Sequence, residues 1–126
     1  MKAAREKFQQ KRIILVYQPH QIERTKILFK EFVESFDDVD ILILNEIFKV
    51  AGREEEKGKI SSRNLAEDIQ RRWQKLGYKK KTIKFIKDQD DIFRELKHLI
   101  KKGDVLIVMG AGDIYKLTLK LRSKNL

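Results

Sequence analysis

His20 and Arg24 are the two side chains of this sequence best placed for substrate chemistry. His20 directly follows the strand-like run that ends in Tyr17, Gln18 and Pro19, so its imidazole is expected to project from a strand end rather than into a core. Arg24 lies four residues further on, at the start of a helical pattern. A guanidinium and the positive end of a helix can together hold a carboxylate or a phosphate there.

Both residues also have a structural interpretation. A lone histidine after a strand is more often a hydrogen-bonded structural residue than a functional one. Arg24 can pair on the surface with Glu23 or with another nearby carboxylate. Their position after a strand therefore makes them candidates, with both interpretations open.

A glycine-containing turn, Gly110-Ala111-Gly112-Asp113, follows the last apolar run of the chain. It resembles half of a dinucleotide-binding fingerprint, but the third glycine is missing because Ile114 and Tyr115 follow. A tight strand-to-helix turn with Asp113 as the helix cap is at least as good an interpretation as ligand contact. No G-x-x-x-x-G-K-[ST] loop occurs, so the sequence contains no P-loop for a nucleoside triphosphate.

Several other kinds of chemistry are excluded or disfavoured. The chain has no cysteine, which rules out disulfides and thiolate ligands, and its two histidines leave little for a zinc site. Glu54, Glu55 and Glu56 indicate a solvated loop, since consecutive carboxylates rarely converge on one ion. No metal site is predicted, His98 is given no role, and Trp73 is expected in the core.

The elements that must position these residues are strands alternating with helices. Near-continuous Ile/Val/Leu strands in such an alternation favour a Rossmann-like, doubly wound α/β fold, with a mostly parallel sheet and helices on both faces. Leu65, Ile69, Trp73 and Leu76 are expected to face the core from one helix, and Ile92, Leu96, Leu99 and Ile100 from the next. Strands are predicted at residues 12–18, 39–44, 82–87 and 105–109. Helices are predicted at residues 1–10, 23–36, 88–102 and 115–122, and Gly103 is expected to stop the third of these. A further helix is predicted to begin at a cap on Ser61 or Ser62 and to stop at Gly77.

In such sheets, ligands bind beyond the carboxyl ends of the strands. Four polar segments are predicted at this edge, residues 18–24, 45–54, 88–91 and 110–113. The candidate site residues there, besides His20 and Arg24, are Gln18, Glu46, Gly110, Gly112 and Asp113.

The net charge of +10 raises the possibility of a polyanion partner. Residues 71–102 carry 12 basic and 4 acidic side chains, whereas residues 31–70 carry 5 and 11, so the excess is segmental. No aromatic-interleaved RNA-binding signature accompanies it. A freestanding basic module for nucleic acid or another polyanion therefore remains the alternative.

The apolar runs fall far below the ~18 residues of a membrane span, so a soluble, cytoplasmic, single domain over residues 1–126 is expected, with no membrane partner.

Three ordered motifs carry a family resemblance. Together they resemble the C-terminal domain of the UDP-N-acetylmuramate:L-alanine ligases, within the Mur ligase family, and the match covers nearly the whole chain. The motifs are Tyr17-Gln18-Pro19-His20-Gln21-Ile22-Glu23-Arg24-Thr25 followed by Phe29-Lys30-Glu31-Phe32; Asn45-Glu46-Ile47-Phe48 leading into Ala51-Gly52-Arg53-Glu54 and Ile60-Ser61-Ser62; and Met109-Gly110-Ala111-Gly112-Asp113-Ile114-Tyr115-Lys116.

This resemblance implies one domain of a bacterial, ATP-dependent ligase of peptidoglycan synthesis, and hence a role in cell wall biogenesis, cell shape and cell division. In that family an N-terminal domain holds the uridine nucleotide, a central domain binds ATP with Mg²⁺, and the C-terminal domain closes over both. Residues 1–11 look like the segment that enters from the central domain, so Met1 is expected to mark an excised domain or a split gene. The isolated domain is expected to be inactive.

The resemblance also implies roles for residues. The family activates the sugar carboxylate as an acyl phosphate, which the amino group of L-alanine attacks. Arg24 would grip the carboxylate of L-alanine, His20 would help to orient it, and Asp113 would line the same edge. Gln21 and Ile22 depart from the pattern, because many members have an arginine and an aromatic residue there.

Overall fold

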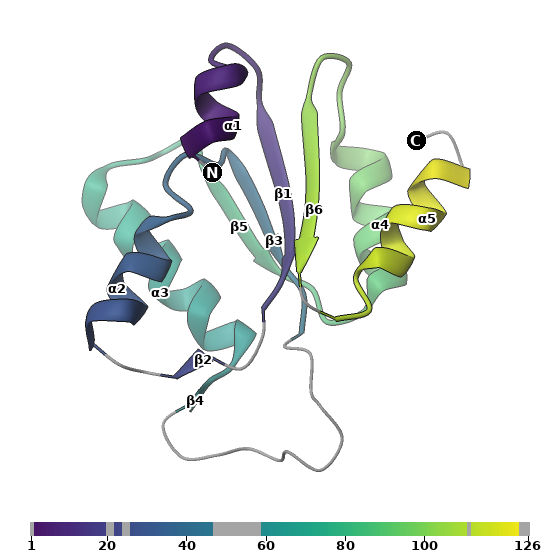
Figure 1. The fold of residues 1–126 in the computed structure, drawn as a ribbon. Helices are drawn as coiled ribbons and strands as arrows, with labels where there is room; N and C mark the ends of the chain where they lie inside the picture. Colours follow the sequence, from purple (N-terminus) through teal and green to yellow (C-terminus); the bar gives the residue numbers. More distant parts are fainter. Residues whose placement is uncertain (1, 20–21, 24–25, 47–58, 111, 124–126) are drawn as a thin grey trace.

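A four-stranded parallel sheet forms the centre of the chain in a computed structural model (Figure 1). The structure describes residues 2–19, 22–23, 26–46, 59–110 and 112–123. The strands are β1 (Ile13–Gln18), β3 (Ile41–Leu44), β5 (Thr82–Phe85) and β6 (Val105–Gly110). They lie in the order β5-β3-β1-β6, and every neighbouring pair is parallel. The predicted parallel α/β fold is thereby confirmed.

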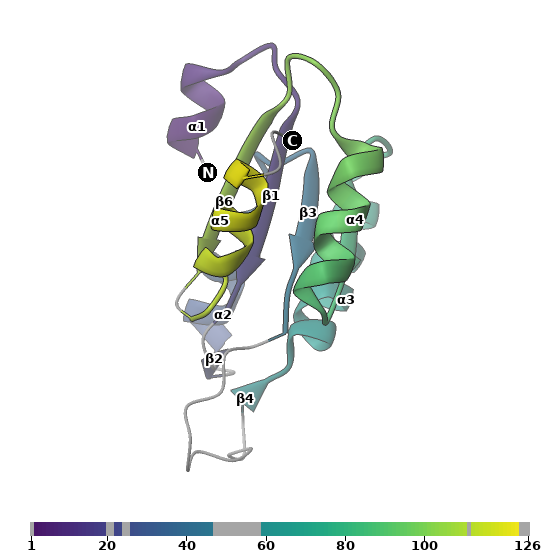
Figure 2. The ribbon, with the colours of Figure 1, turned by 90° about the vertical axis from the view of Figure 1, so that its right-hand side faces the viewer.

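Helices cover both faces of this sheet (Figures 1 and 2). On one face lie α2 (Lys26–Glu34) and α3 (Ser62–Leu76), with the short α1 (Lys2–Lys7) beside them, and on the other lie α4 (Gln89–Leu99) and α5 (Tyr115–Ser123). Because alternate side chains of a strand point to opposite faces, β1 contributes to two apolar cores. The first contains Ile13, Leu15, Leu42, Leu65, Ile69 and Trp73, and the second contains Ile14, Val16, Ile43, Ile92, Leu96 and Leu117.

The predicted signals for the ends of α3 are confirmed. The hydroxyl of Ser61 accepts a hydrogen bond from the backbone N–H of Asn64 at 3.1 Å, which caps the helix start. Gly77 ends the helix in the left-handed conformation, with φ of 79°. Leu76 was predicted to face the core, but it is 46% exposed because it is the last helical residue, beyond the stripe that ends at Trp73.

Other predicted boundaries were wrong. The helix predicted from residue 23 begins at Lys26, because Ile22–Glu23 forms a short strand, β2, which pairs antiparallel with β4 (Lys59–Ile60). The helix predicted to stop at Gly103 ends at Leu99 instead. There Arg12 donates to the Leu99 carbonyl at 2.7 Å, so a side chain from the start of β1 satisfies the helix end.

Candidate functional site

The carboxyl ends of β1 and β6 lie at the point where the chain connections diverge. From β1 the chain passes through α2 to β3 on one side, whereas β6 lies on the other side of β1 and leads into α5 on the opposite face. Gln18 and Gly110, the last residues of these two strands, are paired in register. Ligands of doubly wound sheets bind at such a switch point, so the geometry supports the predicted edge as the candidate site.

Gln18 is the centre of a hydrogen-bond network at this edge, and its side chain is only 4% exposed. Its Nε2 donates to Oδ1 of Asp113 at 2.9 Å and to Oδ1 of Asn45 at 3.2 Å. Its Oε1 accepts from the backbone N–H of Ile114 at 3.1 Å. A single buried amide thus joins the end of β1 to the end of β3 and to the turn after β6.

Asn45 extends this network to β5, and sequence reasoning gave it no role. It is 2% exposed, and its Nδ2 donates to the backbone carbonyls of Ile86 at 3.0 Å and Lys87 at 2.8 Å. The available signal was its position, because a polar residue directly after a buried strand needs partners if it is to be buried as well. Asn45 therefore holds the ends of three strands together.

Asp113 is held from two sides, but not as the predicted helix cap. Its Oδ1 accepts from Gln18 and also from Nε2 of Gln89 at 3.1 Å. The first turn of α5 is satisfied by the backbone instead, since the Lys116 N–H bonds to the Asp113 carbonyl at 3.0 Å. Gln89 lies in a segment predicted at this edge, although its contact with Asp113 was not foreseen.

Gly110 has a structural reason to be glycine. A Cβ atom at this position would lie 2.7 Å from the Gln18 carbonyl oxygen and 2.8 Å from the Gln18 Cβ, closer than atoms pack. The close approach of β6 to β1 therefore requires the glycine, whether or not a ligand contacts it. Gly112 lies half-buried in the bend before α5.

The remaining candidates are placed only in part. Glu46 is half-buried and directly follows Asn45 at the same edge. His20 and Arg24 lie outside the described residues, so the substrate-binding roles expected for them stay predictions. The nearest described residues on either side of His20 are Pro19, directly after the network residue Gln18, and Ile22 of β2.

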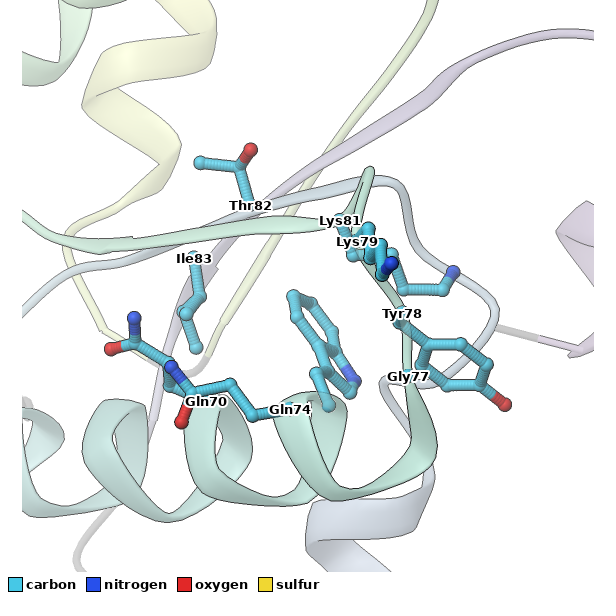
Figure 3. Close-up of a pocket in the computed structure, with 9 residues that line it drawn as sticks. Gln70, Gln74, Gly77, Tyr78, Lys79, Lys81, Thr82 and Ile83 are labelled. Carbon is cyan, nitrogen blue, oxygen red and sulfur yellow. The ribbon is translucent and has the colours of Figure 1, made fainter.

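A pocket of about 440 Å³ lies elsewhere, between the end of α3 and the start of β5 (Figure 3). Gln70 and Gln74 extend from the helix on the side facing Ile83 of the strand. Lys81 lines it too and donates to the Val39 carbonyl at 2.8 Å, and burial lowers the pKa of its ammonium group. The lining residues include no carboxylate or histidine, so the pocket offers no acid–base pair, and it lies at the opposite end of the sheet from the network.

The comparisons with known proteins agree with this architecture. The fold and the strand order define a Rossmann-like α/β domain, a class in which ligands bind at the carboxyl edge of the sheet. Residues 1–112 match the family described as "Mur ligase, glutamate ligase domain". The chain therefore belongs to the Mur ligase family.

Full-length relatives define the match further. The chain is 44% identical over 114 residues to the UDP-N-acetylmuramate–L-alanine ligase of Clostridium kluyveri, covering 90% of this chain and 23% of that enzyme. It is 38% identical over 122 residues to the ligase of the same name from Caldanaerobacter subterraneus, covering 97% and 25%. The corresponding ligase of Wigglesworthia glossinidia brevipalpis is 34% identical over 126 residues, covering 100% and 25%. The chain thus spans about a quarter of the length of these relatives.

Proposed function

We propose that this chain is the C-terminal domain of a bacterial UDP-N-acetylmuramate:L-alanine ligase and contributes the L-alanine site of that enzyme. In this proposal the domain works in the cytoplasm, in peptidoglycan synthesis, together with an N-terminal and a central ligase domain. One structural observation supports it most. The buried network around Gln18 fixes the strand end from which the segment with His20 and Arg24 continues.

The proposed chemistry of this domain is positioning. Arg24 binds the carboxylate of L-alanine through a charge-assisted, two-point hydrogen bond, and His20 helps to orient the amino acid toward the activated sugar carboxylate. In the proposal, the hydrogen-bonded network of Gln18, Asn45 and Asp113 holds the strand end that precedes this segment in the sequence. Positioning of this kind accelerates a reaction between two bound reactants, because their translational and rotational entropy is already lost on binding.

In the proposal, ATP and Mg²⁺ are bound mainly by the central domain of the enzyme. Among the residues that the structure describes, no group of three or more His, Asp or Glu side chains is arranged to hold a metal ion. The whole sequence also lacks the P-loop pattern. Nucleotide and magnesium binding are therefore assigned, within the proposal, to the other domains of the enzyme.

In the described part of the chain, no helix has the length and apolar character needed to cross a membrane.

Complementation in solution tests the proposal. This chain is mixed with the separately produced N-terminal and central domains of the C. kluyveri relative, and phosphate release is measured with ATP, Mg²⁺, UDP-N-acetylmuramate and L-alanine. Activity is expected in the mixture and in neither component alone. If a chimera, in which this chain replaces the C-terminal quarter of that relative, is folded but inactive, the assignment to this ligase is wrong.

Arg24→Ala provides the residue-level test. In the chimera, loss of a charged hydrogen-bond partner worth roughly 1.5–3 kcal/mol is expected to raise the KM for L-alanine about 10- to 100-fold. Arg94→Ala is the matched control, because Arg94 is exposed on α4 and forms an ion pair with Asp91 of the same helix. An unchanged KM for L-alanine in Arg24→Ala contradicts the carboxylate role.

The polyanion alternative is tested separately. Part of the basic excess is engaged within the fold, since Arg5, Arg12 and Arg72 each form an ion pair with an aspartate. Binding of a DNA or RNA oligonucleotide that falls steeply with salt supports the alternative, and no binding at low salt removes it.

A further inference from the structure

The carboxylate of Asp113 is held by neutral donors on one oxygen only. Gln18 and Gln89 both donate to Oδ1, at 2.9 Å and 3.1 Å. Within the residues that the structure describes, Oδ2 has no hydrogen-bond partner and the carboxylate has no ion pair. The fold therefore orients this group and leaves one of its oxygens available.

No ion pair in the described part of the chain uses the negative charge of Asp113. An asparagine amide oxygen would accept the same two hydrogen bonds, and the first turn of α5 bonds to the backbone carbonyl of residue 113 rather than to the side chain. Other partly buried aspartates of this domain are neutralised by arginine. These ion pairs are Arg5–Asp40, Arg12–Asp104 and Arg72–Asp37, each at 2.6 Å. A half-buried carboxylate without a cation is suited to bind a positively charged ligand group.

We propose that Oδ2 of Asp113 binds the α-ammonium group of the amino-acid substrate. This inference rests on the proposed function, in which Arg24 binds the α-carboxylate. The same buried amide, Gln18, contacts Asp113 directly and begins the segment that leads to Arg24. In this inference Asp113 supplies the negative charge that selects for the amino group of the substrate.

Asp113→Asn in the chimera separates recognition of charge from support of the fold. The asparagine keeps an acceptor for Gln18 and Gln89, so the thermal unfolding midpoint is expected to fall by no more than about 5 °C, the effect of removing a charge next to the N-terminus of α5. The KM for L-alanine is expected to rise at least tenfold, as a charge-assisted hydrogen bond is lost. The inhibition constant of propanoate, which has the carboxylate but lacks the amino group, is expected to remain unchanged.

Two further variants complete the test. Asp113→Glu retains the charge on a longer side chain and is expected to recover part of the affinity for L-alanine. Glu67→Gln, at an exposed position on α3, is the control for a change of net charge and is expected to alter neither constant.

Three outcomes overturn the proposal. An unchanged KM for L-alanine in Asp113→Asn shows that the amino group binds elsewhere. Equal weakening of L-alanine and propanoate shows that residue 113 acts only by holding the loop in place. A folded wild-type chimera that does not ligate L-alanine refutes the proposed function itself, and the assignment of Asp113 fails with it.

Discussion

Asn45→Ala tests whether the buried network holds the carboxyl edge of the sheet together. The substitution removes two hydrogen bonds to the carbonyls of Ile86 and Lys87 and one from Gln18. Each bond contributes about 1 kcal/mol net, and a buried group left without a partner costs about 1–3 kcal/mol. The carbonyls lie at a partly buried edge that water can reach, so we expect a total loss of about 3 kcal/mol.

The expected loss can be measured by thermal and urea unfolding, followed by circular dichroism. For a domain of this length, 1 kcal/mol corresponds to a shift of roughly 3–5 °C, so the midpoint should fall by about 10 °C. Asn64→Ala is the control, because Asn64 is exposed on α3 and only its backbone N–H takes part in the cap. That variant should change stability by less than about 0.5 kcal/mol.

A second variant separates hydrogen bonding from the loss of volume. Asn45→Asp retains the shape of the side chain but replaces the donor with an oxygen that faces two carbonyls. At neutral pH it should therefore destabilise the domain at least as much as Asn45→Ala. If both variants lose less than about 1 kcal/mol, the network does not hold the edge, and the argument from buried amides is wrong.

Three further predictions concern individual positions. Gly110→Ala should lower the free energy of unfolding by about 2 kcal/mol in urea titrations, because its Cβ overlaps the backbone of Gln18. Gly77→Ala should cost only about 1 kcal/mol in the same titrations, since nothing lies within 4 Å of the added Cβ and only the left-handed backbone opposes it. Hydrogen bonding from Arg12 holds the pKa of Asp104 below its ordinary value, so the stability that this carboxylate contributes above about pH 4 is lost as the pH falls. Acid titration of Asp104→Asn should therefore show a weaker loss of stability than titration of the wild type.

The sheet could be predicted well from the sequence because its strands are buried on both faces. A run such as Ile13 to Tyr17 has no polar alternation, and this continuity identifies a central parallel strand without knowledge of its partners. The small β2–β4 sheet gave no such signal, since two residues are too few to show a period. The end of α4 was misplaced because its carbonyl partner, Arg12, lies 87 residues away in the sequence.

The common position of the candidate residues Gln18 and Asp113 at one edge was predictable, but their contacts were not. Gln18 and Asp113 were expected at the same edge because both follow strands of one parallel sheet. Their direct hydrogen bond spans 95 residues, and the bond from Gln18 to Asn45 spans 27. Only the strand order β5-β3-β1-β6, which places β1 between β3 and β6, brings one side chain within reach of both.

Gly110 and Asp113 have different environments within one short motif. Gly110 is the last residue of β6 and lies against Gln18, so packing alone accounts for it. Asp113 follows after the bend, where the strand contacts have ended, and its charge is not required by any contact in the described part of the chain. A motif residue that packing explains is weak evidence for ligand binding. A charged side chain that the fold orients without an ion pair is stronger evidence. Substitutions at 110 should therefore change stability, and the isosteric change at 113 should change substrate affinity.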